Sequence, residues 1–343
     1  MADRPTGART GAFAPGRVNL IGDHTDHTGG FALPFALELG TTVTGVTGGD
    51  EVVLRSADAG GVAVVPLDVD DPSTVEPPWA RYVAGVIAEV RPRVGFSGTV
   101  STTLPVGAGL SSSAALELAV ALALGFRGTP LELALACQRA EQRASGVPCG
   151  VMDQLTSAAG VDGHALLLDC AALTVTPVPM PEDLEVVVVH SGEERALAGS
   201  AYGERRAACE AAASLLGPLR DADLDDLARI TDPLVRKRAR HVITENGRVL
   251  DMVAALSAGD HAAAGSLLAA SHASLAVDLE VSTPGLDALV SQLSGEPGVH
   301  GARLTGAGFG GCVVALAERG ALPGRGWHVR PGHAAHVSHH EAT

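Results

Sequence analysis

Five side chains that can recognise a polyol or a phosphate fall within a short glycine-punctuated stretch, residues 14–33. They are one guanidinium, two imidazoles and two carboxylates: Arg17, Asp23, His24, Asp26 and His27. Carboxylates and imidazoles exchange hydrogen bonds with hydroxyls, and a guanidinium offers a fixed fork of donors suited to phosphate. The apolar runs 18–21 and 31–37 predict two buried strands joined by this polar loop. A polar surface hairpin explains the same residues equally well.

A second glycine-rich turn, residues 105–113, lies between a strand predicted over 96–105 and a helix. Gly107 and Gly109 permit close approach of backbone to a ligand, and three serines at 111–113 supply hydroxyls and helix caps. A helix N-terminus carries about half a positive charge and free N–H groups, which predicts a phosphate site. The alternative is a serine-capped helix packed on a sheet. Ser112 stands where a dinucleotide-binding motif needs its third glycine.

Two acids and a third glycine-rich turn follow. Glu141 lies near the end of a helix predicted over 131–146, and Asp153 follows the loop 147–150. Solvated surface acids are the ordinary interpretation of both. The turn within residues 301–316 precedes an apolar strand, and it is either a plain hairpin or a loop pressed against a ligand.

The remaining pattern supplies the elements that must position these groups. Strands are predicted over 41–47, 51–56, 60–69, 164–170, 173–178 and 185–190. Apolar residues at helical spacing predict an amphipathic helix over 79–90 whose ordinary role is core packing, and the chain becomes helical from about residue 200. Five of the thirteen histidines follow Trp327, where a strand and a tail are expected, with any metal binding incidental.

Composition limits the functions that the chain can perform. Its 343 residues are 46% hydrophobic, which predicts a globular protein of two domains. The formal charge of −15 argues against nucleic acid and anionic membrane as partners, so small molecules are the expected ligands. Lys237 is the only lysine, and this excludes a Walker, Schiff-base or protein-kinase lysine anywhere else in the chain.

Targeting signals and cysteine chemistry are not indicated. The first residues lack the apolar core of a signal peptide, and no run approaches the length of a membrane span, so a cytoplasmic location is expected. The five cysteines are widely spaced and include no CxxC pair, which argues against both a disulfide framework and a zinc site. Buried free thiols are expected at Cys137, Cys149, Cys170, Cys209 and Cys312.

Three stretches in fixed order resemble the GHMP kinase superfamily and, within it, the galactokinase family. They are GRVNLIGDHTD (16–26), LPVGAGLSSSAALE (104–117) and LTGAGFGGCVVAL (304–316). Other similar stretches are WARYVAGV, VPCGVMDQ, AYGERRAACE, RARHVITENGRVL and SHASLAVDLEVSTP, so the resemblance covers nearly the whole chain. Mevalonate and homoserine kinases share the second stretch but lack GDHTD, which ties the sequence to the sugar branch.

The resemblance implies an α/β protein of the α+β type with the two-domain GHMP kinase fold. Residues 1–170 would form a half similar to ribosomal protein S5, and residues 171–343 a ferredoxin-like half whose motif at 301–316 returns to the cleft. The implied activity is ATP-dependent phosphorylation of the anomeric hydroxyl of D-galactose, giving α-D-galactose 1-phosphate. The implied partners are ATP, Mg²⁺ and a small sugar, with no nucleic acid and no membrane, and the implied state is a monomer.

The resemblance also implies a role for each matching residue. Arg17 would stabilise the transferring phosphoryl group, and Asp153 would face the reacting hydroxyl. Ser113 and Glu141 would bind magnesium, as one hydroxyl and one carboxylate can for an ion that otherwise keeps water and phosphate. The implied sugar-binding residues are Asp23, His24, Thr25, Asp26, Gly150 and Tyr202. The implied ATP-binding residues are Gly107, Ala108, Gly109, Leu110, Ser111, Ser112 and Ser113.

The sequence departs from the family pattern at several positions. Asp23 replaces the commoner glutamate, His27 replaces tyrosine, AVDLEVS replaces a version containing RDD, and Gly285 stands where glutamate is frequent. The lead into the first motif is also short. These departures concern the acceptor more than the chemistry. The rivals to a galactokinase are therefore a kinase of another sugar, amino sugar or cyclitol, and a catalytically silent sensor that binds sugar and ATP.

Overall fold

A six-stranded sheet forms one end of the molecule. The computed structural model describes residues 7–105, 109–193 and 198–338. The sheet has the order β13-β1-β3-β6-β4-β5, and its one parallel pair is β4–β6. Its strands are β1 (Arg9–Asn19), β3 (Pro34–Thr47), β4 (Glu51–Ser56), β5 (Val62–Pro66), β6 (Phe96–Thr102) and β13 (His336–Ser338). The strands predicted over 41–69 and 96–105 are thus confirmed.

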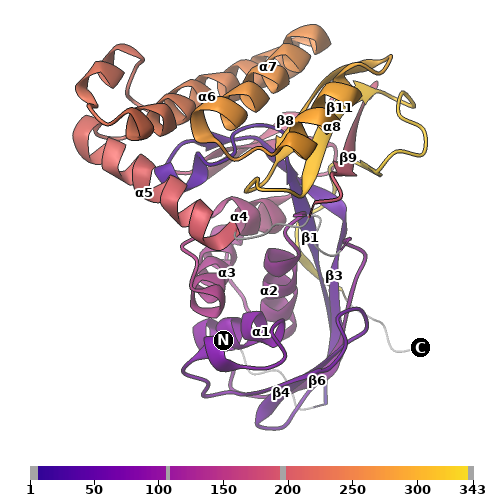
Figure 1. The fold of residues 1–343 in the computed structure, drawn as a ribbon. Coiled ribbons are helices and arrows are strands. Elements are labelled where there is room, and N and C mark those ends of the chain that lie inside the picture. The colour runs from indigo at the N-terminus through magenta and orange to yellow at the C-terminus, as the bar shows by residue number, and fades with distance from the viewer. Residues whose placement is uncertain (1–6, 106–108, 194–197, 339–343) are drawn as a thin grey trace.

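Four helices cover one face of this sheet (Figure 1). They are α1 (Ala80–Val90), α2 (Ser112–Ala123), α3 (Pro130–Ser145) and α4 (Met152–Ala159). Alternate strand residues such as Val52, Leu54 and Phe96 are buried against them, as period-two side chains of a half-covered sheet must be. A capping box between Thr129 and Glu132 begins α3, and a left-handed glycine ends it. These two caps fix the ends of α3 and therefore the position of Glu141 along the helix.

A four-stranded sheet of order β10-β11-β9-β12 forms the other end. Its strands are β9 (Leu184–His190), β10 (Val299–Thr305), β11 (Cys312–Glu318) and β12 (Trp327–Val329). Both faces are apolar. Val187 and Val313 pack towards α8 (Pro284–Ser294), while Val186 and Val314 share a core with α6 (Pro233–Ala258) and α7 (His261–Ser274).

A small third sheet, of order β2-β7-β8, lies where the two ends of the molecule meet. Its strands are β2 (Phe31–Ala32), β7 (His164–Asp169) and β8 (Thr174–Pro179), and α6 packs on β2 and β8. The remaining helices are α5 (Ala198–Leu216), the 3₁₀ turns η1 (Asp26–Thr28), η2 (Pro72–Thr74) and η3 (Asp225–Arg229), and the π-turn η4 (Leu275–Leu279). Because β2 comes from the first sixty residues and α6 from the second half, this sheet joins the two ends.

The histidine-rich C-terminal segment returns to the first sheet. β13 adds to the edge of β1, with His336 opposite Phe13. An edge strand offers unpaired N–H and C=O groups, and a short returning strand satisfies them. The strand expected in this tail is present, and it belongs to the six-stranded sheet beside β1 rather than to the four-stranded sheet.

The cysteines and one apolar helix complete the description. In the described part of the chain the five cysteines form no disulfide, and all but Cys149 are buried. Among the described residues, the helical segment His261–Leu279 is long and apolar enough, by length and composition alone, to cross a membrane. In the fold it comprises α7 and η4, and it packs against α6 and β10 with Leu268 and Leu275 fully buried. A core helix of this kind passes the same test.

The close packing of α7 on β10 yields a stability prediction. A methyl group at Gly265 would overlap the backbone carbonyl of His300. Gly265→Ala should therefore lower the free energy of unfolding by about 1–3 kcal/mol, as overpacking typically does, although alanine is the better helix former. Gly247 in α6 is the matched control because a methyl group there meets open space. Gly247→Ala should raise stability by up to about 1 kcal/mol in urea unfolding. Equal effects at both positions would contradict the packing argument.

Candidate active site

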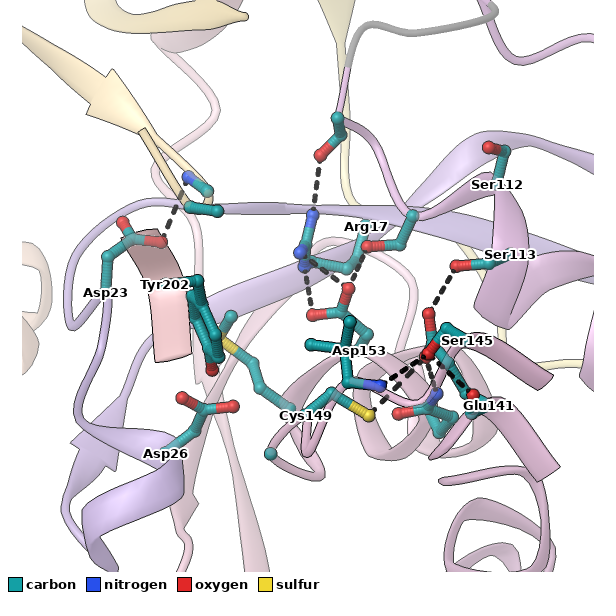
Figure 2. Close-up of a pocket in the computed structure, with 18 of the residues that line it drawn as sticks. Arg17, Asp23, Asp26, Ser112, Ser113, Glu141, Ser145, Cys149, Asp153 and Tyr202 are labelled. Atoms are coloured by element: carbon teal, nitrogen blue, oxygen red, sulfur yellow. Dashed lines mark hydrogen bonds and ion pairs between the residues drawn. The ribbon is translucent and has the colours of Figure 1, made fainter. Parts of the chain in front are cut away.

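A cavity of about 810 Å³ lies where the two ends of the molecule meet. Its walls are the end of β1, the start of α2, the α3–α4 loop, α5 and the β10–β11 turn. All three glycine-rich stretches and both isolated acids reach it, as Figure 2 shows for many of the residues. The expected residues that line it are Arg17, Asp23, His24, Asp26, Gly109, Ser111, Ser112, Ser113, Glu141, Gly150, Asp153 and Tyr202.

The centre of the site is a bidentate pair between Arg17 and Asp153. Arg17 Nε donates to Asp153 Oδ1 at 2.8 Å, and Nη2 donates to Oδ2 at 2.7 Å. The third arm of the guanidinium donates to the carbonyl of Gly109 at 2.9 Å. The register of β1 shifts between Pro15 and Arg17, and this irregularity aims the arginine out of the sheet. Position 16, within the register shift, needs a glycine because a methyl group there would overlap the carbonyl of Leu110.

Asp153 lies in the first turn of α4, where the positive end of the helix dipole favours a carboxylate. The Ser111 hydroxyl also donates to its Oδ2. The Asp153 side chain keeps 27% of its surface exposed, whereas Arg17 is almost completely buried. The carboxylate is therefore held in one orientation and remains accessible to a molecule in the cavity.

The start of α2 differs from the serine cap that the sequence suggested. Ser111 has the left-handed conformation (φ 59°), and its side chain caps no helix amide because its hydroxyl is bonded to Asp153. Ser112 and Ser113 line the cavity beside it. Leu110 does not: its side chain is buried in the core, and its carbonyl accepts from the Arg17 N–H at 3.1 Å. Gly107 and Ala108 lie outside the described residues.

Ser113 and Glu141 are brought together as the resemblance implied. The Ser113 hydroxyl donates to Glu141 Oε1 at 2.8 Å, and Gln154 Nε2 donates to Oε2 at 2.5 Å. The same Gln154 nitrogen also reaches Oε2 of Glu117 at 3.1 Å. Burial, and then the charge of Asp153, raises the pKa of Glu141. Burial, and then the charge of Glu141, raises the pKa of Glu117 well above its ordinary value.

These oxygens fit a small hard cation. Glu117 and Glu141 are crowded acids, and Oε1 of Glu117 and Oε1 of Gln154 are buried with no hydrogen-bond partner in the described structure. A nearby cation would relieve the repulsion that raises both pKa values. Within the described ranges, no three His, Cys, Asp or Glu side chains gather closely enough to hold a metal ion alone. An ion at Ser113 and Glu141 would therefore need oxygens from water or phosphate, as Mg²⁺ does.

The opposite side of the cavity carries rings and a carboxylate. The ring of Tyr202 lies 5.3 Å from that of His24 and 5.6 Å from that of His27, measured between centroids. In Figure 2 the ring of Tyr202 lies between the carboxylates of Asp23 and Asp26. A side chain at Gly150 would overlap the Asp26 carboxylate in its present position, so the glycine leaves room for this carboxylate.

Burial sets the charge of these groups. It raises the pKa of Asp26 to about 6, and the nearby charge of Asp153 adds to the effect. It lowers the pKa of His27 to about 4 and that of His24 well below its ordinary value, so both imidazoles are neutral at pH 7. Burial also raises the pKa of Tyr202, which keeps its phenol protonated. This side of the cavity thus offers uncharged donors and acceptors together with one carboxylate, which suits hydroxyl groups.

Two expected sugar-binding residues have other contacts. The Thr25 side chain is fully buried away from the cavity, and its hydroxyl lies 2.8 Å from the carbonyl of Gly22 and 2.6 Å from that of Phe31. It shapes the loop. Asp23 lines the cavity, but its Oδ2 pairs with Arg303 of β10 and its Oδ1 accepts from the N–H of Gly306 at 3.0 Å.

Sequence reasoning missed Gln154, Glu117, Tyr82 and Arg303 in this region. Gln154 follows Asp153 directly, and its amide links Glu141 to Glu117. Tyr82 lines the cavity although its helix pattern indicated core packing. Arg303 lies inside the third glycine-rich stretch and is completely buried, and a charged residue among buried apolar neighbours was the signal that could have found it. The other signals were too weak, since an amide or acid on a helix is usually solvated.

Comparison with known proteins agrees with this geometry. Residues 4–45 match the galactokinase galactose-binding signature, residues 81–161 the GHMP kinases N terminal domain, and residues 252–324 the GHMP kinases C terminal region. The galactokinase of Homo sapiens is 43% identical over 338 residues, which span 92% of this chain and 86% of that protein. The chain belongs to the galactokinase family.

Other relatives place it in the same family. Galactokinases of Roseiflexus sp. (strain RS-1) and Haemophilus influenzae (strain ATCC 51907 / DSM 11121 / KW20 / Rd) are 44% and 43% identical, over 90% and 89% of this chain and 83% and 84% of the respective relatives. The structure of Lactococcus lactis galactokinase complexed with galactose superposes with a TM-score of 0.88 at 32% identity, covering 96% of this chain and 95% of that one. The predicted family and its two-domain α+β GHMP kinase fold are therefore confirmed.

The departures from the galactokinase pattern have local partners. A side chain at Gly285 would overlap the carboxylate of Glu193, which also accepts from the Thr283 hydroxyl at the start of α8. In the AVDLEVS segment, Glu280 accepts from the fully buried Arg238 at 2.6 Å and from Lys237 at 3.0 Å. The only lysine thus forms an ion pair outside the cavity.

The raised pKa of Asp26 yields a pH prediction. Because the carboxyl holds its proton in the free enzyme up to about pH 6, kcat/KM for the sugar should rise about tenfold per pH unit below 6 and then level off. Asp26→Asn should remove this step in a pH–rate profile. If the variant shows the same step at the same pH, the step belongs to the titration of another group.

The raised pKa of Asp26 also predicts how the stability of the protein depends on pH. Stability should fall over the pH range in which the activity rises. Between about pH 4 and pH 6 the folded protein holds a proton on Asp26 that the unfolded chain releases, so the free energy of unfolding falls as the pH rises through this window. Without sugar, Asp26→Asn should therefore be more stable than the wild type at pH 7 in thermal unfolding. A less stable variant would show that ionised Asp26 is well solvated or paired.

Proposed function

We propose that this chain transfers the γ-phosphoryl group of ATP to the anomeric hydroxyl of D-galactose and forms α-D-galactose 1-phosphate. The observation that carries the proposal is the Arg17–Asp153 pair. In one cavity, this pair lies between the N-terminus of α2 and the side with Asp26 and Tyr202, which suits hydroxyl groups. Its relatives at about 43% identity are galactokinases, and the structural neighbour at 32% identity was solved with galactose. We infer that ATP occupies the α2 side of the cavity and the sugar occupies the Asp26 side.

Asp153 is the group that we assign to the sugar hydroxyl. Its two oxygens are fixed by Arg17 and Ser111, so its remaining acceptor capacity points in a defined direction. It orients the hydroxyl and takes its proton as the phosphorus–oxygen bond forms. Arg17 carries out two tasks: it holds the Asp153 carboxylate in one orientation, and its charge stabilises the negative charge on the transferring phosphoryl group.

The start of α2 is the group that we assign to the triphosphate. Ser111 leaves the first helix amides uncapped by its side chain, so these N–H groups and the helix dipole are available to phosphate oxygens. We assign Gly107 to Ser113 to this loop, with Leu110 contributing through its backbone. The Gly109 carbonyl binds Arg17, which connects the phosphate loop to the catalytic pair. The absence of a lysine in this loop is consistent with neutralisation by backbone N–H groups.

Mg²⁺ is the cation that we assign to Ser113 and Glu141. When bound, it would neutralise phosphate charge during transfer. Gln154 holds the Glu141 carboxylate in place, and the Ser113 hydroxyl lies beside it. On the sugar side, we assign hydroxyl contacts to Asp26, His24, Tyr202 and the backbone at Gly150. The neutral imidazole and the protonated phenol donate or accept, while Asp26 accepts.

The proposed reaction is tested with a panel of acceptors and one variant. D-Galactose should be the best common hexose in a coupled ADP-release assay, and glucose should be poor because its C4 hydroxyl has the opposite configuration. Asp153→Asn should lower kcat by about 10² to 10⁴-fold, since it removes the proton acceptor but keeps the shape, while ATP binding survives. Near wild-type turnover in this variant would remove Asp153 from its role. A preference of about 100-fold for a cyclitol or amino sugar over galactose would show that galactose is not the acceptor, while the proposed kinase reaction would stand.

The proposed metal site is tested by a magnesium titration. Glu141→Gln keeps the hydrogen bonds to Ser113 and Gln154 within reach but removes the charge, so the Mg²⁺ concentration needed for half-maximal rate should rise about 10- to 100-fold. KM for galactose should change far less. Glu132→Gln on the exposed start of α3 is the control, because that acid serves only the helix cap. An unchanged titration in the Glu141 variant would return that residue to a structural role.

The organisation of the molecule is part of the proposal. We assign residues 1–170, with the returning strand β13, to an N-terminal unit and the rest to a C-terminal unit, supported by the separate six- and four-stranded sheets. We further propose a monomer in the cytoplasm that binds neither membrane nor nucleic acid, in line with the charge of −15. Light scattering during size-exclusion chromatography measures the molar mass in solution and so tests whether the chain is a monomer.

A further inference from the structure

Asp23 and Asp26 lie three residues apart on the same loop, but their environments differ. Asp23 is 2% exposed, whereas Asp26 is only partly buried and its carboxylate lies directly against Gly150. Asp23 uses Oδ2 for Arg303 and Oδ1 for the N–H of Gly306. A carboxylate that is almost completely covered and bonded at both oxygens offers little surface to a sugar hydroxyl.

Arg303 requires this carboxylate. Its side chain is 0% exposed, and burial lowers its pKa to about 9, so it still carries its charge near neutral pH. Within the described residues, Asp23 is the acid that pairs with it, and its other contact is the carbonyl of Leu20 at 2.8 Å. A fully buried charge without a partner is strongly unfavourable, so Arg303 and Asp23 cannot be treated as independent.

The pair belongs to a row of contacts between the first and third glycine-rich stretches. Thr305 donates to the carbonyl of Asn19 at 2.9 Å, and His24 Nε2 lies 3.2 Å from the carbonyl of Ala307. From the other side, the ring of His241 contacts the backbone carbonyl of Asp23 at 3.0 Å. His24 and Ala307 both line the cavity. The position of the His24 ring is therefore set by the same contacts that hold the β10–β11 turn.

We propose that Asp23 and Arg303 act as one positioning unit for the sugar site and that Asp23 is not itself a ligand of the sugar. The unit ties the sugar-binding loop to the β10–β11 turn and so holds His24 and the Gly306–Ala307 backbone at the cavity wall. The inference rests on the proposed function for its kinetic readout.

A double-mutant cycle tests whether the pair acts as a unit. Asp23→Asn and Arg303→Gln should each raise KM for galactose by about tenfold or more with a smaller effect on kcat, because ground-state positioning is lost. The double variant should be no worse than either single variant, since residues of one unit are not additive. Arg303→Lys, which keeps the charge, should recover part of the loss. Additive effects would overturn the proposal.

Deoxygalactoses distinguish positioning from direct binding. In Asp23→Asn the preference for galactose over the 2-, 3-, 4- and 6-deoxy sugars should stay within about threefold of the wild-type ratio for each, because no hydroxyl contact has been removed. Loss of preference against one deoxy sugar would show that Asp23 binds that hydroxyl and would overturn the inference. If the single variant fails to fold, the double variant carries the same comparison, because it leaves no unpaired buried charge.

Two controls keep the outcomes separate. Arg238 is a second fully buried arginine, paired with Glu280 outside the cavity, so Arg238→Gln should lower the melting temperature without raising KM for galactose. An equal KM effect there would assign the Arg303 result to general destabilisation. If the wild type does not phosphorylate galactose, the proposed function fails, while the same cycle on the free energy of unfolding still tests the coupling of the pair.

Discussion

The Arg17–Asp153 pair is the interaction on which the rest of the site depends. It joins a strand of the large sheet to the first turn of a helix, and the third arm of Arg17 reaches the carbonyl of Gly109 in the glycine-rich turn before α2. Replacing a buried ion pair by apolar groups is often neutral or favourable for stability. Its role here is chemical: it holds a carboxylate in one orientation in a cavity that is otherwise rich in acids.

The excess of acids explains most of the perturbed pKa values. Asp26, Asp153, Glu117 and Glu141 approach one another, while Arg17 is the cation that contacts one of them inside the cavity. Their repulsion and burial destabilise the protein without ligands. A divalent cation near Glu141 and hydroxyl donors near Asp26 would relieve that cost, and ligand binding would then be coupled to folding stability. Such a site trades stability for function.

The sequence predicted what is local and failed where distance along the chain is large. The strand periodicities and the helical spacing over 79–90 are local patterns, and the structure contains the strands and the helix that they predict. The link from Gln154 to Glu117 spans 37 residues, and the return of the C-terminal strand to β1 spans the chain. Propensity and spacing do not encode such pairings, because an amide, an acid or a short edge strand can find many partners.

The same limit separates Asp23 from Asp26. A motif match assigns both acids to the sugar, since residue type and spacing are all that it reads. Their roles diverge because a residue 280 positions away, Arg303, is buried beside one of them and not the other. The buried guanidinium of Arg303 pairs with Asp23. Asp26, which pairs with no cation among the described residues, keeps a raised pKa and the partial exposure that ligand binding needs. Environment, rather than position in the motif, decides which acid of a binding loop meets the substrate.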